Sequence, residues 1–169
     1  MDTTFPRQLK RQAARYPNRP AMREKAYGIW QTTSWGEMLR LVRCLACGLH
    51  EAGLRRGEHL VVIGANRPRL YATMLAAQSL GAIAVPLYQD AVAGECVFPI
   101  NNAEVRVCVV EDQEQVDKML EIRGQCPQLE RIWYDDARGL RNYEQAGVQS
   151  LDGVVGPGGA VDRGHPGFF

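Results

Sequence analysis

The turn GANRP, residues 64–68, follows an apolar strand-like segment and precedes a helical pattern, where nucleotide-binding folds place their phosphate-binding loop. Such a loop needs the spacing G-x-G-x-x-G, which lets backbone amides approach a pyrophosphate. This turn has a single glycine, and Pro68 removes an amide that would face the anion. We therefore predict a structural role for Arg67, with contact to a phosphate as the alternative.

A second glycine-rich stretch, Gly153–Gly159, contains enough glycines for such a loop. It has neither a strand-like segment before it nor a helical pattern after it, so we predict a flexible loop there. The P-loop sequence G-x-x-x-x-G-K-[ST] occurs nowhere in the chain.

Ser79 lies in the sequence AQSLG, which is close to the G-x-S-x-G pattern of a nucleophilic serine. That serine must occupy a sharp turn between a strand and a helix. Ser79 instead comes near the end of a predicted helix, and Ala77 replaces the first glycine. The sequence therefore predicts an ordinary serine at a helix end.

Cys44, Cys47 and His50 form a C-x-x-C-x-x-H pattern within a predicted helix. Successive steps of three residues rotate by about 60° around a helix, so the three side chains fan out. The chain offers no second pair of ligands at zinc-site spacing, and the pattern does not lie at the strand–helix junction of a thioredoxin-like site. We therefore predict that these residues serve packing rather than metal or redox chemistry.

Carboxylates occur in pairs at Glu111-Asp112 and Asp135-Asp136, where two predicted strands end. Either pair could line a cleft at the edge of a sheet. Capping of the following helix by Asp112 explains the first pair without catalysis. The residues alone thus contain no complete catalytic arrangement.

The composition indicates one domain: the chain has 169 residues, of which 46% are hydrophobic, and a net charge of +1. This balance gives no strong electrostatic signal for binding to nucleic acid or to an anionic membrane. Seven of the twenty basic residues nevertheless fall in residues 7–25, against only Asp2 and Glu24. We interpret this stretch as a solvated helix face. The alternative is a helix at a membrane surface, but its apolar side, formed by Leu9, Ala13 and Tyr16, is too small for that role.

The apolar runs and cysteines bear on location. No N-terminal run has the length of a signal peptide, and none approaches a transmembrane span. The five cysteines are an odd number, and several lie in apolar runs, which favours reduced, buried thiols. We therefore predict a cytoplasmic protein without a transmembrane segment.

Apolar periodicity and turn residues predict the order of the elements. A helix over 5–17 and a hairpin over 21–33 precede a helix over 34–53, whose Ser34 and Glu37 have capping-box spacing. Strands and helices then alternate, which predicts an α/β fold with a mainly parallel sheet and flanking helices. The predicted strands are 59–64, 82–87, 105–110 and 130–134, and the predicted helices begin at Pro68 and Gln113.

Two regions are less regular. Pro99 lies within the segment 89–103, where a helix would need its missing amide donor. Apolar periodicity is lost over residues 139–169. We therefore divide the chain into a domain over 1–138 and a Gly-rich, poorly ordered tail over 139–169.

Five segments in this order resemble the N-terminal part of AMP-forming acyl-CoA synthetases, and most nearly the long-chain fatty acid–CoA ligases of the adenylate-forming superfamily. The resemblance runs from Phe5 to the end of the chain, and the tail GVVGPGGAVDRGHPGFF resembles a degraded version of the segment leading to that family's central domain. The segments are TTSWGEMLRLVRCLACGL, GLRRGEHLVVIGANRP, AAQSLGAIAVPLY, AEVRVCVVEDQEQVDKML and LERIWYDD.

The resemblance implies an enzyme that uses ATP and Mg²⁺ to convert a fatty acid to an acyl-adenylate and then transfers the acyl group to coenzyme A. The family's Ser/Thr/Gly-rich loop ending in Pro-Lys-Gly, its later adenylate motifs and its C-terminal lysine are absent here. None of the lysines, Lys10, Lys25 and Lys118, lies in a matching context. We therefore assign no catalytic, cofactor-binding or metal residue and expect no bound cofactor.

The matched region departs from the family at Arg69-Leu70, where an acidic residue and a tryptophan are usual, and at Pro99, which interrupts an expected helix. The first hypothesis is an inactive N-terminal fragment of a ligase, with unpaired sheet edges that promote self-association. The alternative is a standalone, non-catalytic α/β module that binds a small molecule or a longer ligase.

Overall fold

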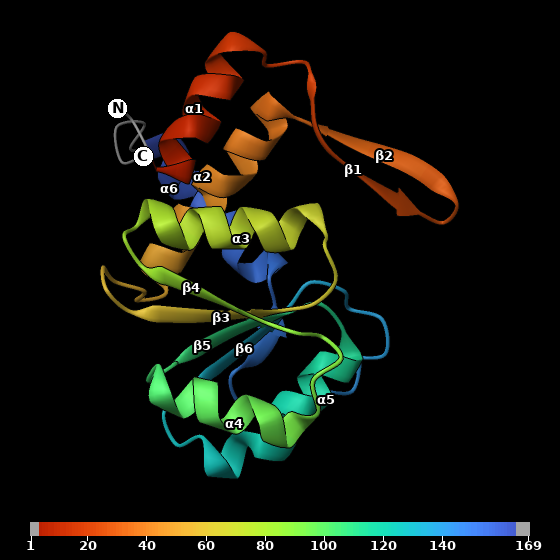
Figure 1. Ribbon diagram of the computed structural model, residues 1–169, viewed down its shortest axis with the longest axis vertical. Helices are drawn as coiled ribbons and strands as arrows, with labels where there is room; N and C mark the ends of the chain where they lie inside the picture. Colours follow the sequence, from red (N-terminus) through yellow and green to blue (C-terminus); the bar gives the residue numbers. More distant parts are fainter. Residues whose placement is uncertain (1–3, 165–169) are drawn as a thin grey trace.

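In residues 4–164, which the structure describes, a sheet of five parallel strands in the order β4-β3-β5-β6-β7 forms the centre of this computed structural model (Figure 1). The prediction of a parallel α/β sheet preceded by a helix and a hairpin is confirmed. The elements are α1 (Phe5–Arg15), β1 (Pro20–Ala26), β2 (Ile29–Ser34), α2 (Trp35–Glu51), β3 (His59–Ile63), α3 (Pro68–Ser79), β4 (Ile83–Leu87), α4 (Ala93–Asn102), β5 (Val107–Val110), α5 (Gln113–Ile122), the 3₁₀ turn η1 (Arg123–Gln125), β6 (Arg131–Tyr134), β7 (Val148–Ser150) and α6 (Asp152–Gly164).

An apolar core lies on each face of the sheet, because successive side chains of a strand point to opposite faces. In β3, Leu60 and Val62 join the core beneath α2, α3 and α6, whereas Val61 and Ile63 join the core above α4 and α5. Figure 1 shows these helix layers on opposite sides of the sheet. This arrangement explains why Leu60–Ile63 of β3 and all of β5 are apolar.

Local hydrogen bonds fix the start of α2, as its capping box predicts. The Ser34 hydroxyl accepts from the Glu37 amide at 3.3 Å, and the Glu37 carboxylate accepts from the Ser34 amide at 2.8 Å. The hydrogen bond from the Ser34 backbone lowers the pKa of Glu37.

No helix within residues 4–164 combines the length and the apolar character that crossing a bilayer requires.

Strand β4 corrects one expectation, because its apolar sequence predicts a strand covered on both faces. The structure places it at the sheet edge, where Ile83 remains 48% exposed. The Ile83 amide donates to the Glu58 carbonyl on the β3 side. Because the backbone amides of successive residues in a strand point to opposite sides, the nitrogen of Pro86, three residues later, points away from β3. The missing amide of Pro86 therefore lies on the open side, where proline is tolerated and blunts further strand pairing.

Pro99 does not interrupt its helix, contrary to the expectation from the sequence. Helix α4 runs from Ala93 to Asn102, and the Ala103 amide still donates to the Pro99 carbonyl at 3.1 Å. Proline leaves one carbonyl four residues earlier without its helical partner. The buried side chains of Cys96 and Ile100 hold the helix against the core despite that loss.

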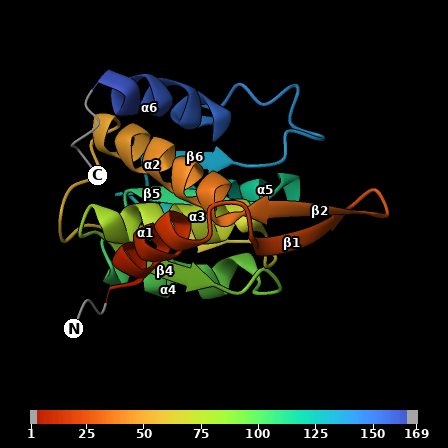
Figure 2. The same cartoon turned by 90° about the horizontal axis from the view of Figure 1, so that it is seen from above.

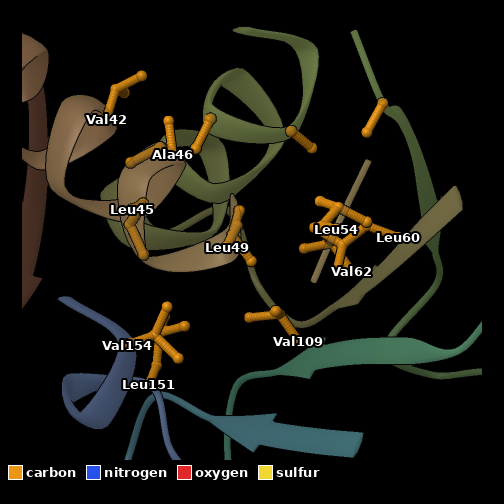
Figure 3. Packing of buried hydrophobic residues seen from close by; sticks show 14 of the residues in the cluster. Val42, Leu45, Ala46, Leu49, Leu54, Leu60, Val62, Val109, Leu151 and Val154 are labelled. Carbon is orange, nitrogen blue, oxygen red and sulfur yellow. The ribbon is translucent and has the colours of Figure 1, made fainter. Parts of the chain in front are cut away.

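The glycine-rich stretch also corrects the prediction of a flexible loop and a poorly ordered tail. Residues Val148–Ser150 form β7, which pairs with β6, and Asp152–Gly164 form α6, which packs on α2. Figure 3 shows Leu151 and Val154 in the same cluster as Leu45 and Leu49. The part of the predicted tail over 165–169 lies outside the described residues.

Close contact between helices explains the glycines of α6. A Cβ on Gly158 would collide with the Cys44 carbonyl, and a Cβ on Gly48 would collide with the Val154 carbonyl. Glycine at these positions lets α2 and α6 approach until their backbones touch. The helix is therefore held by packing rather than by intrinsic helix propensity.

A Gly158→Ala substitution should lower the free energy of unfolding by about 1–3 kcal/mol, because the added methyl forces α2 and α6 apart. Gly156 is the matched control, since a Cβ there meets nothing within 4 Å. Gly156→Ala should raise stability by up to about 1 kcal/mol through helix propensity. Urea unfolding of both variants tests this, and equal effects would contradict the close-packing interpretation.

Candidate functional site

The strand order creates a topological switch point between β3 and β5. The chain passes from β3 outward to β4, crosses back, and continues through β5 and β6 on the other side. The turns after β3 and β5 therefore diverge, and in open α/β sheets ligands bind in the crevice that forms there. These turns contain Gly64–Arg67 and Glu111-Asp112, the residues considered above for phosphate binding and for carboxylate chemistry.

The Glu111 carboxylate fills this crevice. Its Oε2 accepts a hydrogen bond of 2.5 Å from the Ala65 amide, and its Oε1 accepts one of 3.0 Å from Arg67 Nε. The Glu111 side chain is only 15% exposed. A backbone donor and a guanidinium that could have held a phosphate are thus already bound to a carboxylate of the same chain.

The same arginine also reaches the hairpin. Arg67 Nη1 lies 3.4 Å from Glu24 Oε2 of β1, and hydrogen bonding to Glu111 raises the pKa of Arg67. Gly64 permits this packing, because a Cβ there would lie 2.6 Å from the Glu111 Cβ. The predicted structural role of Arg67 is therefore what the structure shows.

The second carboxylate pair meets the first, as expected for neighbouring parallel strands. The Asp135 amide donates to the Val110 carbonyl at 3.0 Å, and the Asp136 amide donates to the Glu111 carbonyl at 2.7 Å. Asp112 caps α5 by accepting from the Gln115 amide at 3.3 Å. The predicted cap is confirmed.

Arg69 forms ion pairs with Asp135 of the second pair and with Asp152, a role that the sequence does not reveal. Its Nε lies 2.8 Å from Asp135 Oδ1 and its Nη2 lies 2.7 Å from Asp152 Oδ1 of α6. Burial raises the pKa of Asp135, although the charge of Arg69 opposes that shift. Hydrogen bonding to Arg138 lowers the pKa of Asp136.

These contacts leave the edge cluster, defined as Glu24, Arg67, Arg69, Glu111, Asp135 and Asp152, without the arrangement that acid–base catalysis needs. Its carboxylates and guanidinium groups are engaged with one another rather than directed at an open space. Within residues 4–164, no group of three or more His, Cys, Asp or Glu side chains has an arrangement that could hold a metal ion.

An open groove of about 670 Å³ lies beside the edge cluster, over the ends of β3 and β4. Its walls are mainly apolar, with Leu70 and Met74 from α3 and Leu87 from β4. The Tyr71 hydroxyl, also in the wall, donates to Asn66 Oδ1 at 3.0 Å. The groove offers apolar surface but no concentration of charge.

The remaining candidate residues have structural roles. Ser79 Oγ donates to the Leu75 carbonyl at 2.7 Å near the end of α3, which confirms the prediction of an ordinary helix serine. Cys44 and Cys47 lie on α2, where burial raises the pKa of both thiols, and Cys44 backs onto the glycines of α6. Raised thiol pKa values and close packing agree with the predicted packing role.

The class of protein follows from the similarity of most of the chain to a known family. Residues 9–159 match the family model described as AMP-binding enzyme. The chain therefore belongs to the AMP-binding enzyme family.

Three relatives illustrate the match. A long-chain-fatty-acid–CoA ligase of Xenopus laevis is 28% identical over 118 residues, which cover 70% of this chain and 16% of the ligase. One of Mycobacterium bovis is 24% identical over 135 residues, which cover 80% of this chain and 21% of the ligase. An uncharacterized protein of Mycobacterium tuberculosis is 32% identical over 117 residues, 69% of this chain and 65% of that protein. The chain thus spans about a fifth of the two ligases.

Solved structures confirm the fold. An anthranilate CoA ligase in complex with anthranoyl-AMP has a TM-score of 0.76 at 21% identity, covering 88% of this chain and 27% of that chain. A didomain of carboxylic acid reductase from Segniliparus rugosus in complex with AMP has a TM-score of 0.80 at 20% identity, covering 95% of this chain and 27% of that chain. The fold is therefore part of an adenylate-forming enzyme domain.

Replacing Glu111 by glutamine should lower the free energy of unfolding by about 1.5–3 kcal/mol, because a charged partner is removed from Ala65 and Arg67. Glu114 is the control: it is 69% exposed and forms an i,i+4 pair with Lys118, so Glu114→Gln should change stability by less than about 0.5 kcal/mol. Urea unfolding at neutral pH measures both, and a Glu111 effect no larger than the control would contradict the closed crevice.

Asp135→Asn should change stability in a pH-dependent way. Because folding raises the pKa of Asp135 above its usual value of 3.8, the folded protein retains this proton after the unfolded chain has lost it. Wild-type stability relative to the Asn variant should therefore fall as pH rises from 3.8 through the folded pKa, and then level off. Parallel urea titrations across this range test the sign, and a rising difference would contradict it.

Proposed function

We propose that this chain is the N-terminal structural portion of an AMP-forming long-chain fatty acid–CoA ligase. The complete enzyme would convert ATP, a fatty acid and coenzyme A to acyl-CoA, AMP and diphosphate. The match of residues 9–159 to the AMP-binding family carries the proposal, and the long-chain ligases among the relatives give the substrate class. On this proposal residues 1–138 belong to the partial AMP-binding domain, whose sheet and core continue through β7 and α6 before the chain leads toward the remainder.

The residues of this chain do not fit Mg²⁺ and ATP, which supports a structural role for it. The crevice at the switch point, where a nucleotide phosphate would be expected, contains the Glu111 carboxylate. A carboxylate in that position repels a polyphosphate and competes for the same donors. We infer that the isolated chain forms no acyl-adenylate and that nucleotide contacts come from other parts of the complete enzyme.

A cytoplasmic location belongs to the same proposal. All five cysteines are free, and Cys47, Cys96, Cys108 and Cys126 are buried, as is usual for proteins in a reducing compartment.

The alternative function is a standalone, non-catalytic module derived from the family. The match to the uncharacterized mycobacterial protein favours it, because the matched region makes up 65% of that protein. The continuous cores on both sheet faces, including α6, also support independent folding. Pro86 at the outer edge of β4 reduces the expected self-association through that edge.

ATP–pyrophosphate exchange with the purified 169-residue chain, Mg²⁺ and palmitate tests the inferred lack of activity. We expect no exchange above the protein-free rate, whereas exchange that depends on the fatty acid would overturn it. A full-length long-chain ligase assayed in parallel serves as the positive control.

Reading the source DNA past the codon for Phe169 separates the two candidate functions. A frame that continues into a Ser/Thr/Gly-rich loop ending in Pro-Lys-Gly supports the ligase portion. An immediate stop codon would contradict it and support the standalone module, for which a monomeric, cooperatively melting chain is then expected.

A further inference from the structure

The chain is electrically divided. Residues 1–34 contain seven basic residues against Asp2 and Glu24, a net charge of +5, and the remaining thirteen basic and seventeen acidic residues give 35–169 a net charge of −4. The structure leaves all seven N-terminal basic side chains exposed, on α1, the turn after it and β1. An N-terminal basic layer thus sits on an acidic body, which the net charge of +1 conceals.

The hairpin β1–β2 projects from that layer away from the sheet and the helices (Figures 1 and 2). Its turn, Tyr27-Gly28, has positive φ at both residues, 50° and 79°, as a tight two-residue hairpin turn requires. At its base, Arg19 accepts a backbone hydrogen bond from Trp35, and Glu24 meets Arg67 of the body.

The strand register gives the two faces of the hairpin different chemistry. Lys25 pairs with Trp30 and Arg23 with Thr32, so these side chains share one face. All four are exposed. Glu24 lies on the opposite face and contacts the body through Arg67, so the face with Arg23, Lys25 and Trp30 points outward.

Apolar side chains occupy the hairpin tip. Tyr27 is 88% exposed, and Ile29 and Trp30 are each 65% exposed. Lys25 and Arg23 follow two and four residues behind Tyr27, which in extended strand is roughly 7–13 Å. An interfacial segment inserts its apolar residues about 5–10 Å into the headgroup region, so basic side chains at this spacing would lie among lipid phosphates.

We propose that the hairpin tip, Tyr27, Ile29 and Trp30, together with Arg23 and Lys25, binds the surface of an anionic membrane. Aromatic side chains favour the boundary between headgroups and acyl chains, and basic side chains are attracted by anionic lipid. Arg7, Arg11 and Arg15, which share one stripe of α1, are also exposed and add to the positive charge of the N-terminal residues. This inference does not depend on the proposed ligase function.

A lipid surface fits these residues better than a nucleic acid does. Single-stranded nucleic acids bind grooves in which bases stack on successive aromatic rings. Here Ile29 and Trp30 lie on opposite faces of a projecting hairpin tip, which offers insertion of the tip rather than a groove. Nucleic acid binding is therefore the competing outcome of the experiment.

Sedimentation of the full chain with sucrose-loaded vesicles tests the proposal. We expect binding to phosphatidylcholine vesicles with about 30% phosphatidylglycerol, roughly tenfold weaker binding to phosphatidylcholine alone, and loss of binding at high salt. The double variants Ile29→Ser/Trp30→Ser and Arg23→Gln/Lys25→Gln should each weaken binding by roughly tenfold. Their thermal melts should match the wild type, because these side chains are exposed.

Two control variants separate the hairpin from other exposed groups. Tyr88→Ser/Phe98→Ser removes two aromatic side chains outside the hairpin that are 87% and 76% exposed. Arg141→Gln/Arg163→Gln removes two exposed positive charges outside the hairpin, as many as the basic hairpin variant removes. Both should bind vesicles like the wild type. The proposal would be overturned if the control variants lost as much vesicle binding as the hairpin variants, or if the chain did not sediment with anionic vesicles. Binding to single-stranded RNA but not to vesicles would also overturn it.

Discussion

The arrangement of the turns at the carboxyl-terminal edge of the sheet depends on the hydrogen bonds that the Glu111 carboxylate accepts. By accepting from Ala65 and Arg67, it joins the turn after β3 to the turn after β5 at the point where the sheet divides. Arg67 extends the connection to Glu24 and so ties the N-terminal hairpin to the central strands. Because the Glu111 side chain is only 15% exposed, its contacts are less screened by water than those of surface ion pairs.

This internal neutralisation also determines what the chain can do. An adenylate-forming enzyme must hold a polyphosphate, and a switch-point crevice is a general location for such a ligand. In this chain the negatively charged Glu111 carboxylate occupies the crevice in which an anion-binding site would be expected. The proposed lack of a nucleotide site is compatible with membership of the AMP-binding family, because the chain spans only about a fifth of the ligases it matches.

Local signals made most of the fold predictable from sequence. Such signals act over a few residues and identify their elements directly. They are the capping box of Ser34 and Glu37, the Asp112 cap and the short apolar runs of the strands. Helix α6 escaped prediction because Gly156–Gly159 reads as a turn, whereas Gly158 provides clearance for α2 across more than a hundred residues of sequence. Leu151, Val154 and Val155 have helical spacing and were the available signal.

The edge cluster shows the same limit. The carboxylate pairs could be placed at strand ends from sequence, but their partners could not, because Arg67 and Arg69 come from another βα unit. The departure from the family at Arg69 has a physical counterpart in its contacts with Asp135 and Asp152. Likewise, the edge position of β4 depends on strand order, which no local pattern specifies.

The most direct test of the closed crevice is the amide NMR spectrum of the 169-residue chain during titration with Mg²⁺ and ATP. The Ala65 amide proton should resonate far downfield, because it donates a short hydrogen bond to Glu111, and its signal and that of Arg67 should not move as nucleotide is added. Saturable shifts of these two amides would show that the crevice opens to a phosphate, and would contradict the account of this chain as a structural portion without a nucleotide site.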